Sequence, residues 1–326
     1  MAFNLKGRSF ITLLDYSPEE IRYLLSLASE LKCLKRVGVR GKSLDRKCIA
    51  LLFEKPSTRT RCAFVTACID EGAHPEYLGK SDIQFGKKES VKDTARVLGR
   101  MFDGIQFRGF SHATAEELAK YSGVPVWNGL TDRFHPTQAL ADVLTLKENF
   151  GDVKGLPWAY VGDGRNNVCN SLMVISAKLG MDFRIVSPQE LFPDPALFSR
   201  CTEIARETGA AIEATSDIDL GVRGVWAIYT DVWASMGEEH MIEERIAMLR
   251  PYQINESMFD KVGRDDAIFL HCLPSFHNME TDVSTKFPDV CEVTDEVFEG
   301  PRSRVFDEAE NRVHTIKAVM VATLGN

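Results

Sequence analysis

Short apolar runs that alternate with amphipathic helical segments are the feature that most constrains the fold of this chain. Residues 48–53 form an uninterrupted apolar run between polar neighbours, which is typical of a strand buried on both faces of a parallel sheet. The same patterns predict further strands at 104–107, 124–127, 158–161, 183–186, 225–229 and 267–270, and helices at 63–69, 114–121, 137–150, 166–179, 195–207 and 238–249. Such alternation indicates parallel sheets flanked by helices.

The alternation is interrupted once, near the middle of the chain, by Gly151, Gly155 and Pro157. A chain of 326 residues is long enough for two cores. We therefore predict an α/β fold of two doubly wound domains, 1–150 and 151–326, each a mainly parallel sheet flanked by helices. A final amphipathic helix, about 310–325, is expected to pack back on the first domain.

Charge and hydropathy exclude several classes of function. The chain has 47 acidic and 39 basic residues, a net charge of -8, and no basic run longer than Lys87-Lys88, so neither nucleic acid nor an anionic membrane is an expected partner. No apolar stretch approaches the ~20 residues of a membrane span, and the N-terminus lacks the apolar core of a secretory signal. We expect a cytoplasmic protein.

Eight cysteines are present without any CxxC pair. Several lie in apolar runs, where a reduced thiol behaves as a small core residue. The spacing of His271, Cys272 and His277 also lacks the paired ligands of a structural zinc site. We expect reduced thiols and no bound metal.

A polar segment, residues 54–61, links the strand at 48–53 to a helix and has the outline of an anion site. Ser57 can cap the helix, so that the first-turn N–H groups, the hydroxyls and the Arg59 guanidinium point toward one phosphate. A capped helix with solvated arginines explains this segment about equally well. Further on, Arg108 follows a strand, and His135 and Gln138 offer donors for a carbonyl oxygen and an amide.

In the second half, Gly162-Asp163-Gly164 resembles the start of a dinucleotide-binding turn. Asn167 stands where the third glycine is expected, and the next strand is followed by Ser187-Pro188 instead of an acidic residue. A nicotinamide cofactor is therefore not predicted. Asn166 and Asn167 at a helix start can instead bind a small carboxylate.

Two later loops also follow predicted strands, where ligands of open α/β sheets bind. The first contains Asp231, Ser235 and Met236, although Ser235 with Glu238 also fits a capping box of purely structural role. The second contains Cys272, a potential nucleophile. His271 is a poor base for that thiol, because successive side chains of an extended segment point to opposite faces.

Four motifs occur together in order: Ser57-Thr58-Arg59-Thr60-Arg61, His135-Pro136-Thr137-Gln138, Asp231-Val232-Trp233-Ala234-Ser235-Met236-Gly237 and His271-Cys272-Leu273-Pro274. With them the chain resembles the aspartate/ornithine carbamoyltransferase family from about residue 5 to the C-terminus. The last two motifs are similar to the ornithine branch. The resemblance implies carbamoyl transfer from carbamoyl phosphate to L-ornithine, a homotrimer or a multiple of trimers, and no metal or organic cofactor.

The resemblance also implies roles for single residues. Carbamoyl phosphate would be held by Ser57, Thr58, Arg59, Thr60, Arg108, His135, Gln138 and Arg312, with Gln84 reaching a neighbouring subunit's site. Ornithine would be held by Asn167, Asp231, Ser235, Met236, Cys272 and Leu273. The catalytic set would be Arg108, His135, Gln138, Asp231 and Cys272.

Two positions depart from the family pattern, and three other functions stay open. Gly164 and Ser275 stand where the family usually has alanine, which leaves the fine geometry of two ligand loops undecided. The alternatives are a carbamoyltransferase for another amine such as putrescine, a noncatalytic phosphate-binding homologue, and a Cys272 thiol hydrolase.

Overall fold

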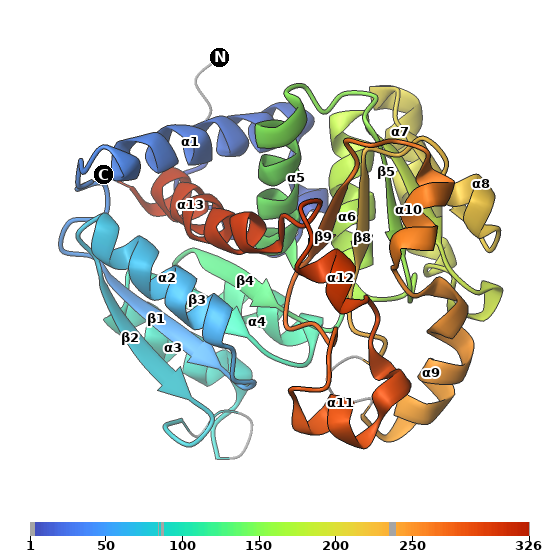
Figure 1. Cartoon of the computed structure of the whole chain (residues 1–326). Coiled ribbons are helices and arrows are strands. Elements are labelled where there is room, and N and C mark those ends of the chain that lie inside the picture. Colours follow the sequence, from blue (N-terminus) through green and yellow to red (C-terminus); the bar gives the residue numbers. More distant parts are fainter. Residues whose placement is uncertain (1–3, 84, 86–87, 235–238, 326) are drawn as a thin grey trace. The chain divides into compact units, whose positions relative to one another are not determined.

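The computed structural model describes residues 4–83, 85, 88–234 and 239–325. The chain divides into two compact units, which we describe one at a time (Figure 1). The first unit comprises the chain up to Leu144 together with the residues from Glu310 onward, and the second comprises Thr145–Ala309. The predicted fold class is confirmed, since each unit is a parallel sheet flanked by helices.

The first unit contains a four-stranded parallel sheet in the order β2-β1-β3-β4. Its strands are β1 (Cys48–Phe53), β2 (His74–Gly79), β3 (Gly104–Arg108) and β4 (Val126–Leu130). Strand β2 was not predicted from the sequence. It lies at the sheet edge and is partly exposed, where Pro75 is tolerated because an edge strand leaves one side without ladder partners.

Helices cover both faces of this sheet. They are α1 (Pro18–Arg36), α2 (Thr58–Asp70), α3 (Val91–Met101), α4 (His112–Ser122), α5 (Pro136–Phe150) and α13 (Val305–Leu324). Helices α3 and α4 pack on the face that includes Leu52 and Phe107. Because side chains alternate along a strand, Gln106 and Arg108 point to the opposite face.

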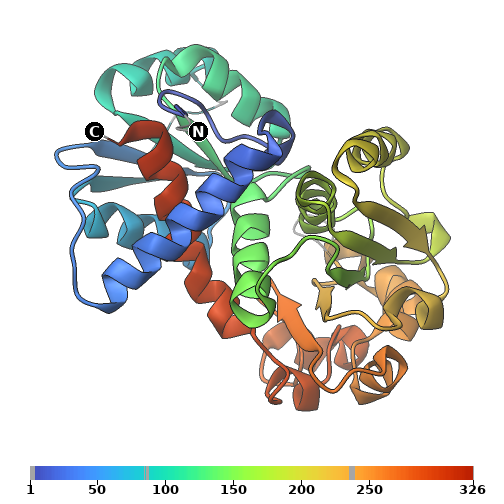
Figure 2. The ribbon, with the colours of Figure 1, turned by 90° about the horizontal axis from the view of Figure 1, so that it is seen from above.

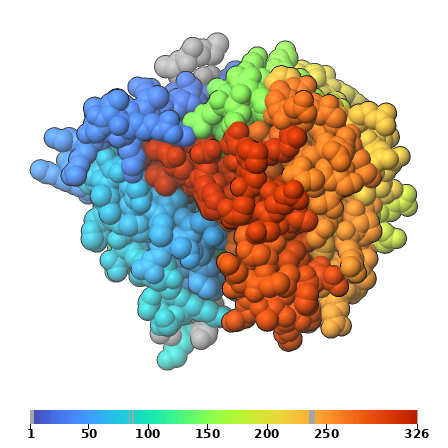
Figure 3. Space-filling model, viewed as in Figure 1, coloured from blue at the N-terminus to red at the C-terminus, as the bar shows by residue number. Residues whose placement is uncertain are grey.

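The C-terminal helix returns to the first unit, as predicted. Lys32 of α1 donates to Asn311 Oδ1 at 2.6 Å, and Lys317 Nζ lies 2.6 Å from Asp70 of α2. Helices α1 and α13 cross each other (Figure 2), and the red surface of α13 lies between the blue surfaces of α1 and α2 in Figure 3. The helix begins at Val305, earlier than the predicted start near residue 310.

The second unit contains a five-stranded parallel sheet in the order β7-β6-β5-β8-β9. Its strands are β5 (Pro157–Val161), β6 (Asp182–Val186), β7 (Ala211–Thr215), β8 (Ala227–Thr230) and β9 (Ile268–His271). The edge strand β7 was also missed from the sequence, because its side chains are partly or fully exposed and form no apolar run. Strands β5, β6, β8 and β9 lie within two residues of the predicted ranges.

The helices of the second unit are α6 (Asn167–Leu179), α7 (Pro195–Thr208), α8 (Ile218–Val222), α9 (Ile242–Leu249), α10 (Glu256–Val262), α11 (Asp282–Lys286) and α12 (Asp295–Phe298). Helices α6 and α7 pack side by side, and α8 and α10 pack with the core cluster around Val161 and Phe269. Helix α9 is shorter than predicted, since a 3-10 turn precedes Ile242. None of the helices in the described part of the chain is long and apolar enough to span a bilayer.

Candidate functional site

The first unit has a topological switch point between β1 and β3. The connection through α2 runs from β1 outward to β2, whereas the connection through α4 runs from β3 in the other direction to β4. The loops after β1 and β3 therefore separate at their carboxyl ends, the usual ligand position in an open α/β sheet. The register Phe53↔Arg108 brings the last residues of these two strands side by side.

Thr60 makes hydrogen bonds with three other residues at this edge of the sheet. Ser57 caps α2 by accepting the Thr60 amide at 3.3 Å, as the sequence predicts. Arg108 Nη1 donates to Thr60 Oγ1 at 3.3 Å, and Arg312 Nη2 donates to the same oxygen at 3.0 Å. Thr60 and both arginines are buried, so two guanidinium groups are held at a helix N-terminus, where the backbone dipole also favours an anion.

His135 joins this cluster as a neutral base. Burial lowers its pKa well below the usual value, and the charges of Arg312, Arg108 and Arg59 lower it further. A neutral imidazole keeps one N–H donor and one acceptor. Such a ring can hydrogen-bond a carbonyl group while the three guanidinium groups attract a phosphate.

Three further residues of the first unit belong to the predicted set: Gln138, Thr58 and Gln84. Gln138, buried in the first turn of α5, donates through Nε2 to Asp142 Oδ1 at 2.8 Å. Thr137 precedes it, and its buried hydroxyl has no hydrogen-bond partner among the described residues. Thr58 lies exposed at the start of α2, and Gln84 lies outside the described residues.

The second unit has its own switch point, between β5 and β8. Asn166 caps α6 after β5 by accepting the Val168 amide at 2.7 Å, and its Nδ2 donates to Asp231 Oδ2 at 2.9 Å. Cys272 Sγ lies 3.2 Å from Asp231 Oδ1 and is the donor of that pair. The side chains after β5, β8 and β9 thus meet at one carboxylate.

His271 does not act on the Cys272 thiol. Its Nδ1 accepts the Leu273 amide at 2.9 Å, so the ring proton resides on Nε2, which lies 3.1 Å from Glu292 Oε1. Burial opposes the charged imidazole, but Glu292, Asp231 and Glu308 together raise its pKa above the usual value. The prediction that His271 is a poor base for Cys272 agrees with this geometry.

A metal ion bound by Asp231, His271 and Cys272 would break a hydrogen bond that His271 makes. Ligand atoms of Asp231, His271 and Cys272 lie within 4.8 Å of one another. Both ring nitrogens of His271, however, already make hydrogen bonds. A metal bound here would displace Glu292 or Leu273 from the imidazole.

The remaining predicted residues of the second unit are Asn167, Leu273, Ser235 and Met236. Asn167 follows the helix cap and is partly exposed, so Asn166 is the asparagine that contacts Asp231. Leu273 packs partly buried against the core and has a φ of 60°. Ser235 and Met236 lie outside the described residues.

Two buried polar groups were missed by reading the sequence. Glu292 accepts from His271 and the following loop, and Arg245 forms a buried ion pair with Asp163 at 3.2 Å. Each is distant in sequence from its partner, and neither belongs to a recognisable motif. The Gly162-Asp163-Gly164 turn was the one available signal, since a buried aspartate at a strand end requires a partner.

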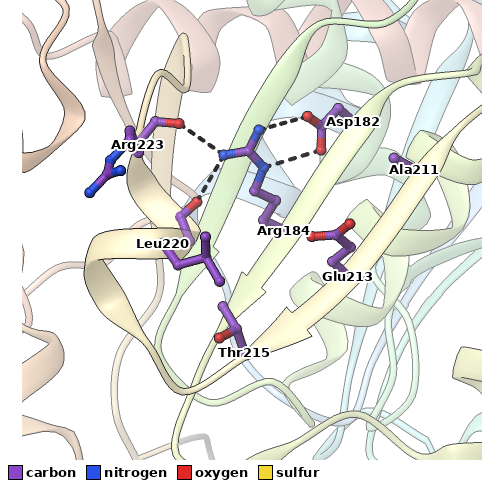
Figure 4. Close-up of a pocket in the computed structure, with 8 residues that line it drawn as sticks. Asp182, Arg184, Ala211, Glu213, Thr215, Leu220 and Arg223 are labelled. Atoms are coloured by element: carbon purple, nitrogen blue, oxygen red, sulfur yellow. Dashed lines mark hydrogen bonds and ion pairs between the residues drawn. The ribbon is translucent and has the colours of Figure 1, made fainter.

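A hollow of about 290 Å³ elsewhere in the second unit is a poorer candidate. It lies along β6 and β7, lined by Asp182, Arg184, Glu213 and neighbouring residues (Figure 4). Arg184 is already held by Asp182 at 2.8 Å and by the Arg223 carbonyl at 2.9 Å. None of the predicted site residues lines it.

Comparison with known proteins covers nearly the whole chain. Residues 8–148 match the family model of the aspartate/ornithine carbamoyltransferase carbamoyl-P binding domain, and residues 154–323 match that of the Asp/Orn binding domain. A catabolic ornithine carbamoyltransferase from Bacillus licheniformis is 61% identical, over 99% of this chain and 98% of its own length. An ornithine carbamoyltransferase from Streptococcus pyogenes is 58% identical, over 98% and 97%.

Solved structures that are similar to this chain are also ornithine carbamoyltransferases. The ornithine carbamoyltransferase from Pyrococcus furiosus superposes with a TM-score of 0.91 at 42% identity, covering 99% of each chain. The enzyme of the same name from Thermus thermophilus superposes with a TM-score of 0.83 at 41% identity, covering 97% of this chain and 98% of the other. Both similarities extend across the two units.

Proposed function

Because the chain belongs to the aspartate/ornithine carbamoyltransferase family, we propose that it transfers the carbamoyl group of carbamoyl phosphate directly to the side-chain amine of L-ornithine. The products are L-citrulline and phosphate, and the reaction is reversible. The observation that carries this proposal is the convergence of Arg108 and Arg312 on Thr60 beside a neutral His135. This arrangement is suited to an acyl phosphate, in which the phosphate is bonded to a carbonyl carbon.

Carbamoyl phosphate is bound by residues of the first unit in this proposal. The phosphate contacts are Ser57, Thr58, Arg59 and Thr60, and the carbamoyl contacts are Arg108, His135 and Gln138. Arg312 approaches the same site from the last helix, and Gln84 acts on a neighbouring subunit. As the bond to the carbamoyl carbon breaks, the leaving phosphate gains negative charge. Fixed guanidinium groups and helix N–H groups therefore stabilise the transition state more than the ground state.

The amino acid is bound by residues of the second unit. Asn167, Asp231, Ser235 and Met236 take the α-amino and α-carboxylate groups, and Cys272 and Leu273 lie near the side-chain amine. That amine has a pKa near the ~10.4 of lysine, so only about 0.1% is neutral at pH 7.4. Cationic neighbours favour the neutral amine, which is the nucleophile, and the phosphate itself can accept the released proton.

The Cys272 thiol acts by contact with Asp231 and not as a covalent nucleophile. Its S–H group donates a hydrogen bond to the Asp231 carboxylate, whereas nucleophilic attack requires the thiolate. The His271 ring nitrogens are occupied by Glu292 and Leu273. This geometry disfavours the thiol hydrolase alternative.

The wider assignments follow from the same proposal. Residues 1–150 form the carbamoyl phosphate-binding domain and residues 151–326 the ornithine-binding domain, with the last helix returning to the first. The chain works in the cytoplasm as a homotrimer or a multiple of trimers, with no cofactor beyond its two substrates. Light scattering on the purified protein tests the assembly, which should have at least three times the 36.5 kDa mass of one chain.

A colorimetric assay of citrulline formation tests the reaction. Purified protein, carbamoyl phosphate and L-ornithine should yield citrulline and phosphate in equal amounts. Ornithine should exceed putrescine in kcat/KM by about 10³ or more, because a diamine leaves the buried polar groups around Asp231 without their α-amino and α-carboxylate partners. Equal values for the two amines would favour a putrescine enzyme, and tight phosphate binding without turnover would favour the noncatalytic homologue.

A further inference from the structure

The loop after β9 is fastened to one carboxylate oxygen. Glu292, fully buried, receives three donors on Oε1: His271 Nε2 at 3.1 Å, Ser275 Oγ at 2.7 Å and the Phe276 amide at 2.7 Å. Its other oxygen, Oε2, has no hydrogen-bond partner among the described residues. The residues that flank Cys272 and Leu273 on both sides are therefore held by a single acceptor.

The backbone of this loop is strained, so it requires hydrogen bonds that hold its conformation. Leu273 has a φ of 60°, a left-handed conformation that costs a non-glycine residue about 1 kcal/mol or more. Its amide is directed to His271 Nδ1, so the position of the imidazole also fixes the peptide that follows Cys272. The hydrogen bond between His271 and Glu292 therefore also helps to keep Cys272 near Asp231.

Of the three donors, His271 and Ser275 are side chains, and His271 also accepts the Leu273 amide, so the Ser275 hydroxyl is the one whose only hydrogen bond to the loop's surroundings among the described residues is the one to Glu292. Alanine at this position would leave the Phe276 amide and His271 on Glu292 but remove the shorter of the two side-chain contacts. A hydrogen bond to a charged group is stronger than one between neutral groups. The hydroxyl therefore contributes directly to how firmly the loop is held.

We propose that Ser275 is a positioning residue for the amino-acid substrate: by sharing Glu292 Oε1 with His271 and Phe276, it fixes the loop that carries Cys272 and Leu273. The proposal rests on the function proposed above. Ser275 does not contact the substrate. It acts through Glu292, so its loss should be felt by ornithine and not by carbamoyl phosphate.

Steady-state kinetics of Ser275→Ala, Ser275→Thr and Ser303→Ala test this role. Ser303 is the matched control, because its buried hydroxyl makes no hydrogen bond among the described residues. Ser275→Ala should raise the KM for ornithine about fivefold, with the KM for carbamoyl phosphate unchanged. Ser275→Thr keeps the hydroxyl and should restore the ornithine KM, and Ser303→Ala should match the wild type.

Several outcomes would overturn the proposal. An unchanged ornithine KM in Ser275→Ala, an equal rise in both KM values, or a threonine variant as impaired as the alanine variant would each show that the hydroxyl has a general packing role only. Wild-type protein is assayed first. If it forms no citrulline, the proposed function fails; if it does and Ser275→Ala behaves like it, only this inference fails.

Discussion

At the scale of single residues, a single buried side chain accepts hydrogen bonds from more than one other side chain. Thr60 Oγ1 receives two arginines, and Asp231 receives Asn166 on one oxygen and Cys272 on the other. Buried polar groups are costly unless they are paired. These shared acceptors therefore fix the positions of several side chains at once.

Removing one guanidinium should impair the use of carbamoyl phosphate. Arg59→Ala and Arg108→Ala are each expected to lower kcat/KM for carbamoyl phosphate by roughly 10² to 10⁴, because each arginine can make two charged hydrogen bonds worth ~1.5 to 3 kcal/mol. Arg96→Ala, which removes an exposed arginine of α3, is the control and should leave kcat/KM near the wild-type value. Near-normal turnover in either test variant would refute the assignment of these residues.

Replacing Cys272 should weaken the enzyme without stopping it. Cys272→Ser keeps a donor toward Asp231, so we expect a higher KM for ornithine and measurable turnover. Intact mass spectrometry after mixing wild-type protein with carbamoyl phosphate alone should show no carbamoyl adduct. An adduct on Cys272 that ornithine discharges at the rate of kcat, or ping-pong kinetics, would require a covalent mechanism instead.

At the scale of elements, the turn from β5 to α6 is tightly packed. The Gly164 amide donates to Ser187 Oγ at 3.2 Å, and that hydroxyl donates to the Leu191 carbonyl at 3.1 Å. A Cβ on Gly164 would lie 2.7 Å from the same Leu191 carbonyl oxygen and 3.0 Å from an Ile185 methyl carbon. The glycine that departs from the family pattern is thus required by this packing.

Gly164→Ala should therefore destabilise the protein. We expect a loss of about 1 to 3 kcal/mol in unfolding free energy, the usual cost of overpacking against backbone, measured as a lower urea midpoint. Gln189→Ala, at an exposed residue just before Leu191, is the control and should change the stability by no more than about 0.5 kcal/mol. A midpoint for Gly164→Ala equal to that of the wild type would mean that the turn relaxes freely.

At the scale of the whole molecule, stability should depend on pH through histidines that fold as neutral groups. His314 of α13 is buried, and burial, followed by the charge of Lys317, lowers its pKa to about 4, with Lys32 acting in the same direction and Glu310 opposing. In the unfolded chain its pKa is ~6.5. The unfolded state then binds the proton first as the pH falls.

Stability from this group is fully present above pH ~6.5 and decreases as the pH falls toward about 4. Urea unfolding of the wild type and His314→Gln at pH 7.5, 6.5, 5.5 and 4.5 measures the effect. The wild type should lose roughly 2 to 4 kcal/mol more than the variant across this range. His112 and His135, whose pKa values are also lowered, remain in both proteins and cancel in the comparison. Parallel curves would contradict the prediction.

The sequence by itself determined the fold class, the central strands and the cap of α2. An apolar run such as Cys48–Phe53 can only be buried on both faces, and Ser57 caps its own helix through a contact three residues away. Both are local patterns. Each motif that carries the family resemblance also lies within one short stretch of chain at a strand end or a helix start, so its residues could be named without knowing the strand order.

Tertiary structure alone decided the two exposed edge strands and the partners of buried polar groups. Strands β2 and β7 have no apolar run, because these two edge strands are partly exposed and are stabilised by backbone pairing with a neighbour. Arg312 reaches Thr60 across 252 residues, and Ser275 reaches Glu292 across 17 residues that include α11. Contacts between distant residues depend on strand order and helix return, which no local pattern encodes.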